Sequence, residues 1–227
     1  MSNTPFFSII TCTLNNCSTI HKPITSVGRQ TFPWFEHIII DGASRDGTTD
    51  ILRSMSKRHR IHWISESDRG ISHALNKGLK LSKGNYILTL QGDDRLLDSN
   101  VLSQVYNELK NETSDIYSYP VLKEMPNRQL KPYPPIRLLW WYHFKSIFPH
   151  QGCFVHRRVF DHIGQFREDF EIAVDYDFFY KALASGATVK LGTFSVAIMG
   201  CQGISSDPSM LEKRLREEAL VQRMNET

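Results

Sequence analysis

The stretch Tyr86-Ile87-Leu88-Thr89-Leu90-Gln91-Gly92-Asp93-Asp94 joins an apolar run directly to two adjacent carboxylates. The apolar part, residues 86–90, has the composition of a buried strand. Open α/β sheets bind ligands outside the carboxyl ends of their strands, where this acidic pair would lie. Two like charges so close together need a cation or hydrogen-bond donors to stabilise them. The stretch therefore predicts either a divalent-metal site for a phosphorylated substrate or a solvated turn whose aspartates cap a helix.

The chain as a whole has the size and composition of a globular α/β domain. It has 227 residues, of which 41% are hydrophobic and 22% charged, and its net charge is +3. That charge is too small to predict nucleic-acid binding. The four cysteines form no C-x-x-C pair, so zinc and redox chemistry are not predicted. Because no apolar run approaches the roughly 18 residues of a membrane span, and no signal peptide is recognised, we expect a cytoplasmic protein.

Strand-like and helix-like segments alternate over the first hundred residues, which predicts βαβ units and a mainly parallel sheet. Strands are expected at 6–14, 37–40, 61–64 and 86–90, and helices at 20–28, 50–55, 71–79 and 99–110. We expect Asp68 to cap the helix that starts near Ile71. Farther on, the pattern predicts a helix over about 175–184, strands within 189–199, and a C-terminal helix opened by a capping box at Ser209.

The middle of the chain is unusual in composition. Five prolines fall in residues 120–135, so regular structure is not expected there. Residues 137–148 then place five large aromatic side chains among basic ones. This composition is typical of an interfacial patch that meets a lipid-linked acceptor at a membrane. The alternative is a buried helix packed on the sheet.

Two other loops carry polar groups at expected strand or helix ends. In Ile38-Ile39-Ile40-Asp41-Gly42-Ala43-Ser44-Arg45-Asp46-Gly47-Thr48, a buried strand ends in an acid before a glycine-rich turn. Asp41 can accept hydrogen bonds from a base or sugar, or it can order an Asx-type turn. In residues 66–78, a helix N-terminus beside Arg69 and Lys77 favours an anion, and a capped helix with a solvated face is the alternative.

Taken in order, four motifs resemble the nucleotide-sugar-binding half of family 2 glycosyltransferases, which are inverting enzymes with a GT-A fold. The motifs are Thr13-Leu14-Asn15-Asn16, the Asp41 loop, residues 66–78 and Gly92-Asp93-Asp94. The resemblance covers residues 6–100 and resumes at 150–158 and 173–178. Within the family, the chain is most similar to bacterial enzymes of colanic-acid and O-antigen type. The resemblance implies one α/β GT-A domain with a Rossmann-like, mainly parallel central sheet flanked by helices. Residues 1–100 would be its nucleotide-sugar-binding half, and residues 101–227 its acceptor-binding and catalytic-base half.

The resemblance also implies the donor contacts. Asp41 would contact the nucleotide base, usually uracil, and Asp68 and Arg69 would lie beside the base, ribose or diphosphate. Thr13 and Asn15 would complete this nucleotide-sugar site.

For the diphosphate, the resemblance implies that Asp94 binds Mn²⁺ or Mg²⁺ and that Asp93 reaches the ribose or sugar. Gly92 stands where the family's DXD motif has its first acid. A hard cation held by one or two carboxylates and phosphate oxygens is the normal arrangement for Mg²⁺, so the departure leaves open only the number of protein ligands.

The acceptor hydroxyl needs a base, either a carboxylate or a histidine. On a helix over about 175–184, Asp177 lies one turn from Lys181 and predicts an exposed ion pair, whereas Asp175 lies on the inward stripe with Phe179. The family's acid at this motif also maps to Asp175, which we choose as the base, and a simple helix cap is the alternative for it. An unperturbed histidine titrates near pH ~6.5, so His150 is another candidate for the base, but we assign it to nucleotide-sugar binding.

Together with these residues, the resemblance implies a metal-dependent, inverting glycosyltransferase of the hexosyl or N-acetylhexosaminyl class. The donor would be a nucleotide-diphospho-sugar, most simply a UDP-sugar. The acceptor would be a glycan or polyprenyl-linked molecule in bacterial surface polysaccharide biosynthesis, with peripheral association at the inner face of the plasma membrane. Two alternatives stay open. One is a catalytically silent nucleotide-sugar-binding or scaffold subunit. The other is a sugar nucleotidyltransferase, which would carry a glycine-rich loop where this chain has Leu14-Asn15-Asn16.

Overall fold

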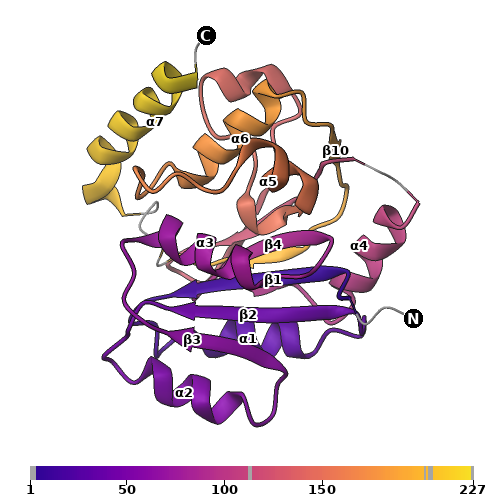
Figure 1. Ribbon diagram of the computed structural model, residues 1–227, viewed down its shortest axis with the longest axis vertical. Coiled ribbons are helices and arrows are strands. Elements are labelled where there is room, and N and C mark those ends of the chain that lie inside the picture. Colours follow the sequence, from indigo (N-terminus) through magenta and orange to yellow (C-terminus); the bar gives the residue numbers. More distant parts are fainter. Residues whose placement is uncertain (1–3, 112–113, 202, 204–206, 226–227) are drawn as a thin grey trace.

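The computed structural model describes residues 4–111, 114–201, 203 and 207–225. In this part of the chain, seven strands form the central sheet in the order β10-β6-β9-β4-β1-β2-β3. Figure 1 shows β4, β1, β2 and β3 side by side. Their bounds are β1 (Phe7–Thr13), β2 (Phe35–Asp41), β3 (Ile61–Ser65), β4 (Tyr86–Gln91), β6 (Ile116–Ser118), β9 (Cys153–His156) and β10 (Val189–Leu191). The strands pair in parallel except for β9, which is antiparallel to both of its neighbours. The prediction of a mainly parallel α/β sheet is confirmed.

Helices cover both faces of this sheet because its strands are apolar on both sides. On one face, Ile10 and Ile38 pack in a cluster with α3 (Ile71–Leu81), α5 (Arg157–Ile163) and α6 (Val174–Ala184). On the other, Ile9 and Ile39 pack with α1 (His21–Gly28), α2 (Thr48–Met55) and α4 (Val101–Leu109). The C-terminal helix α7 (Leu211–Asn225) packs against α6 at the edge of the molecule (Figure 1).

A second sheet corrects the prediction for the proline-rich segment. Its strands, in the order β5-β11-β7-β8, are β5 (Arg95–Leu96), β11 (Ala197–Met199), β7 (Val121–Glu124) and β8 (Leu130–Tyr133). Residues 120–135 therefore contain a hairpin, and the expectation of no regular structure was wrong. Pro132 lies on β8 and pairs with Leu122 of β7. Because β8 is an edge strand, the missing N–H of the proline is tolerated there. Pro120 and Pro126 lie outside the strands.

Two predicted helix caps were also wrong. Gly70 occupies the N-cap position of α3 with φ of 122°, a conformation that favours glycine, and Asp68 instead accepts the Gly70 N–H at 3.0 Å. Ser209 lies inside a short 3₁₀ helix, η4 (Pro208–Met210), and donates its N–H to Asp207 at 2.8 Å. Asp207 followed by proline is the better start signal, because a carboxylate caps well and proline suits the first turn.

The aromatic segment forms a 3₁₀ helix, η1 (Leu139–His143), followed by a second one, η2 (His150–Gly152). No residue of η1 is fully buried, so the segment is not a buried helix. Part of it does pack inside, because Leu139, Trp141 and Tyr142 lie against the core and Ile147 and Phe148 are buried. Five residues in a single 3₁₀ helix cannot bury every ring: Tyr142 packs against Tyr180 of α6, while Trp140 and Phe144 are 57% and 63% exposed. Among the described residues, no helix is both long enough and apolar enough to cross a membrane.

Candidate active site

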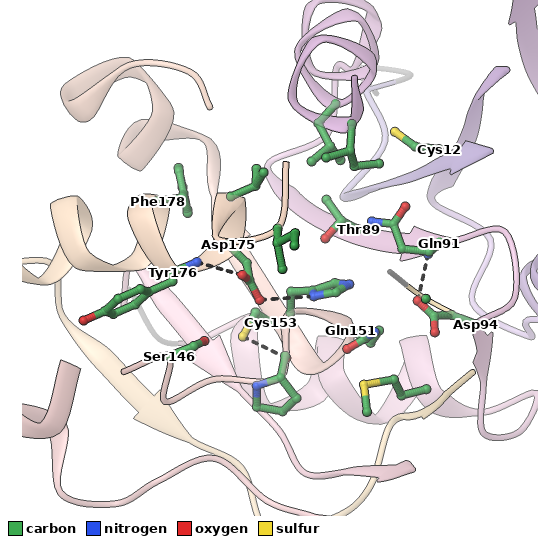
Figure 2. A pocket seen from close by; sticks show the side chains of 18 of the residues that line it. Cys12, Thr89, Gln91, Asp94, Ser146, Gln151, Cys153, Asp175, Tyr176 and Phe178 are labelled. Atoms are coloured by element: carbon green, nitrogen blue, oxygen red, sulfur yellow. Dashed lines mark hydrogen bonds and ion pairs between the residues drawn. The ribbon is translucent and has the colours of Figure 1, made fainter. Parts of the chain in front are cut away.

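A cavity of about 820 Å³ opens at the carboxyl ends of β1 and β4 (Figure 2). Its walls come from those strand ends, the N-terminal turns of α3 and α6, the residues of η2, and one side of α7. The structure brings six of the predicted site residues to this cavity: Thr13, Asp68, Asp93, Asp94, His150 and Asp175. These residues meet because ligand sites of parallel sheets form where the strands end.

The carboxylate of Asp94 is buried and held by the backbone. Its Oδ2 atom accepts the N–H of Gln91 at 2.8 Å, and Oδ1 accepts the N–H of Gly200 at 2.9 Å (Figure 2 shows the first). Asp93 is also buried, and the short strand β5 follows directly. The alternative of a solvated, helix-capping turn was therefore wrong.

Burial raises the pKa of Asp94; the charge of His150 opposes this shift, and the charge of Asp93 adds to it. The described residues contain no group of three or more His, Cys, Asp and Glu side chains suited to a metal. Two adjacent oxygen-donor carboxylates still fit a hard divalent cation that takes its other ligands from phosphate and water. Asp94, with Asp93 beside it, is the pair that could hold one.

Two glycines let the backbone approach this acidic corner. A Cβ on Gly200 would lie 2.0 Å from Oδ2 of Asp93. One on Gly92 would lie 2.8 Å from Oδ1 of Asn16 and 2.9 Å from Oγ1 of Thr13. A side chain at position 92 would therefore have to displace these groups. Sequence reasoning overlooked Gly200, although a glycine directly after an apolar strand was a usable signal.

Asp175 and His150 form a pair on another wall of the cavity. Asp175 lies in the first turn of α6, where Oδ1 accepts the N–H of Tyr176 at 2.8 Å (Figure 2). Its Oδ2 lies 3.4 Å from Nδ1 of His150. The Nε2 atom of His150 is buried without a hydrogen-bond partner among the described residues. Burial lowers the pKa of His150, but the hydrogen bond and charge of Asp175, with the charges of Asp94 and Asp93, raise it overall.

Asp177 points elsewhere. Its side chain is 1% exposed and pairs with Arg167 and Lys181, each at 3.3 Å. The ion pair of Asp177 with Lys181 was predicted, but as an exposed pair, whereas Asp177 is buried. The predicted interior position of Asp175 was also wrong, because its side chain is 32% exposed. Helical periodicity gave the wrong inward face because α6 is packed on several sides. It contacts η1, α5 and α7 in addition to the core cluster on the sheet. Asp177 is not among the described residues that line the cavity.

Asp41, which is buried, and Asn15, which is exposed, hold neighbouring loops by hydrogen bonds. Asp41 is fully buried, and its carboxylate accepts hydrogen bonds from the N–H and hydroxyl of Ser44 and, at 2.6 Å, from the hydroxyl of Ser65. The Oδ1 atom of Asn15 accepts the N–H of Arg45 at 3.0 Å. Neither side chain is among the described residues lining the cavity, so their nucleotide contacts stay predictions.

Arg69 is exposed and donates from Nε to Glu168 at 3.1 Å; the described cavity wall does not include it. Other lining residues were not foreseen. Tyr133 of β8 and Arg214 and Glu218 of α7 all line the cavity. The sequence pattern of α7 is that of a charged, solvated helix, which gave no signal that two of its side chains reach the site.

Comparison with known proteins points to glycosyltransferases in each case. A family model described as glycosyl transferase family 2 matches residues 8–172. A PGL/p-HBAD biosynthesis glycosyltransferase of Mycobacterium tuberculosis is 31% identical over 191 residues, which are 82% of this chain and 72% of that protein. A cholesterol galactosyltransferase of Borreliella burgdorferi is 30% identical over 146 residues, 62% of this chain and 40% of that protein.

Solved structures share the fold. S. aureus TarS 1-349 in complex with UDP-GlcNAc has a TM-score of 0.74 at 19% identity, over 95% of this chain and 66% of that chain. The mannosyltransferase PcManGT from Pyrobaculum calidifontis, in complex with GDP-Man and Mn²⁺, has a TM-score of 0.73 at 18% identity, over 96% of this chain and 63% of that one. This chain thus spans slightly less than two thirds of either neighbour.

Proposed function

The chain belongs to glycosyl transferase family 2 and has a GT-A fold, and from this premise we propose that it is an inverting enzyme that uses a nucleotide-diphospho-sugar. One observation carries the proposal. Asp93 and Asp94 lie on one wall of a single cavity, and Asp175 lies on another. A diphosphate leaving group at the first wall and a base at the second suit attack from opposite sides of the anomeric carbon.

The donor would bind the half formed by residues 1–100, and UDP is the nucleotide we propose. Thr13, Asp68 and Asp93 already line the cavity and would contact the nucleotide sugar. TarS, with UDP-GlcNAc, and PcManGT, with GDP-Man, support a nucleotide-sugar donor for this fold. Asp41 keeps its proposed contact with the uracil of the nucleotide. This contact requires the hydroxyl of Ser44 or Ser65 to release one oxygen of the Asp41 carboxylate.

Asp94, assisted by Asp93, would hold a divalent cation, Mn²⁺ or Mg²⁺; the PcManGT complex, for comparison, contains Mn²⁺. When bound, such a cation would offset the charge that builds on the leaving diphosphate. The protein's own contribution is orientation, because the two backbone N–H groups fix both oxygens of Asp94.

Asp175 would accept the proton of the acceptor hydroxyl. It is ordered by the N–H of Tyr176 and the ring of His150, and it is exposed enough to reach an acceptor in the cavity. His150 would act on the donor side. Its unpartnered Nε2 is a charge-assisted donor for a phosphate oxygen when the ring is protonated.

The acceptor would bind the half formed by residues 101–227, and we propose a glycan or polyprenyl-linked acceptor of surface polysaccharide assembly. The cholesterol galactosyltransferase is a relative whose name gives a lipid as its substrate. The cavity lining includes Lys145, which directly follows the exposed Phe144, and Phe148, which lies four positions after it. This continuity supports peripheral association with a membrane that presents the acceptor.

The proposal is tested by two linked assays. Thermal shift against UDP-, GDP- and dTDP-sugars with Mn²⁺ identifies the donor, because a ligand that binds only the folded state raises its stability. Release of nucleoside diphosphate from that donor is then compared between wild type and Asp94→Ala. Release that needs both the metal and Asp94 supports the proposal. Binding without any release, with or without acceptor extracts, would indicate the silent scaffold instead.

A further inference from the structure

A buried carboxylate on α7 binds the backbone just before α6. Glu217 is 9% exposed, and its Oε2 atom accepts three consecutive N–H groups. These belong to Glu171 at 3.2 Å, Ile172 at 2.8 Å and Ala173 at 2.9 Å. One carboxylate therefore fixes the direction of the chain where it enters α6.

This contact holds the segment that leads into α6, and the last of the three N–H groups belongs to the N-cap residue Ala173. The N-cap residue Ala173 has no side-chain acceptor of its own, and N–H groups at a helix start need partners. Other contacts hold α7 on the same helix. Gln222 donates to the hydroxyl of Tyr176 at 3.3 Å, and Asn225 donates to Asp177 at 3.4 Å.

The fixed segment ends two residues before Asp175. The contact between Asp175 and His150 is already long, at 3.4 Å, so a small shift of the first turn of α6 would break it. A misplacement of about 1 Å at a reacting group can lower a rate about a hundredfold.

We infer that Glu217 is a positioning residue: it holds the first turn of α6 so that Asp175 faces His150 and the cavity. This inference rests on the proposed function, in which Asp175 is the base. Through Glu217, helix α7 would contribute to the active site, although the Glu217 side chain is not among the residues that line the cavity.

The first test needs no activity. The titration of the His150 ring is followed by NMR in ligand-free wild type, with His150→Gln identifying the signal. Asp175, Asp94 and Asp93 are the charged groups that act on this ring. Asp175→Asn gives the shift expected when the partner is lost, and Glu217→Gln should shift the midpoint in the same direction by at least half as much.

Two further variants keep this test decisive. Glu217→Asp retains the charge but withdraws it by one methylene. Its titration midpoint should therefore lie between those of wild type and Glu217→Gln. If Glu217→Gln does not fold, Glu217→Asp replaces it in the test. Glu212→Gln changes an exposed acid on the same helix and should leave the midpoint unchanged. A wild-type midpoint in the folded Glu217 variants would overturn the inference.

The second test is kinetic. Glu217→Gln should lower kcat for nucleotide release at least tenfold while the KM for the donor stays within twofold, and Glu217→Asp should recover part of kcat. A rise in KM with unchanged kcat would overturn the positioning role. A wild type that releases no nucleotide would contradict the proposed function alone, because the NMR titration still decides whether Glu217 places Asp175.

Discussion

The Nδ1 atom of His150 lies 3.4 Å from the Oδ2 atom of Asp175, although the two residues are 25 positions apart in the sequence. His150 is in η2 and Asp175 is in the first turn of α6, so the contact joins two elements that line the cavity. It connects the proposed donor-side histidine to the proposed base. The charge of Asp175 therefore helps to raise the pKa of His150.

Stability should depend on pH through His150. Burial lowers its pKa, but Asp175 and the two acids Asp94 and Asp93 raise it overall. For a histidine with a raised folded pKa, the stabilising contribution is complete below the unfolded value of about 6.5 and is lost as pH rises through the folded value. We expect the free energy of unfolding to fall over that window in wild type and to fall less in His150→Gln. Urea denaturation at several pH values measures both slopes, and equal slopes would contradict the pairing.

Asp177→Asn should damage stability rather than catalysis. The change leaves Arg167 and Lys181 without their buried partner, and we expect a loss of about 3 kcal/mol. Asp175→Asn, which alters a partly exposed group, should change stability much less. Chemical denaturation and nucleotide release, measured on both variants, separate the two aspartates. Full stability with lost turnover in Asp177→Asn would reverse our assignment.

Gly200→Ala should disturb the acidic corner. The new Cβ would lie 2.0 Å from Asp93, so this carboxylate or the strand end must move. Overpacking of this kind destabilises by about 1–3 kcal/mol. We also expect the thermal shift given by donor with Mn²⁺ to shrink, as it should in Asp93→Asn. A full metal-dependent shift in Gly200→Ala would show that the close approach has no role in the site.

The exposed rings near η1 should bind membranes. Trp140 and Phe144 are exposed, and Lys145 lies 5.0 Å from the ring of Trp141. We expect wild type to float with vesicles that contain anionic phospholipid, and Trp140→Ala/Phe144→Ala to float several-fold less. Trp34→Ala is the matched control, because Trp34 is equally exposed elsewhere on the surface. Wild type that does not float, or equal loss in the control, removes the membrane proposal.

Local sequence was enough to predict the strands β1 to β4, because buried parallel strands have continuous apolar runs. The short strand β5 was not predicted. Local sequence also put Asp93 and Asp94 at the end of a strand, whereas the choice of Asp175 needed the family resemblance. The fold brings all three residues to one cavity. The hairpin of β7 and β8 could not be foreseen, since prolines are acceptable only on an edge that the tertiary structure defines.

The contacts that complete the site are long-range. Gly200 donates to Asp94 over 106 positions, and Glu217 accepts from Ala173 over 44. Neither pair has a local pattern, and the helix that carries Glu217 is polar on most of its surface. Packing around α6 likewise determined which aspartate reaches the cavity, a choice that helical periodicity could not make.

The most direct test of the account is nucleotide release by Asp175→Asn at saturating donor and Mn²⁺, with donor binding measured on the same preparation. Removing a general base should lower kcat by about 10²–10⁴ while the donor-induced thermal shift stays at the wild-type value. A kcat within twofold of wild type in this variant would show that Asp175 is not the base.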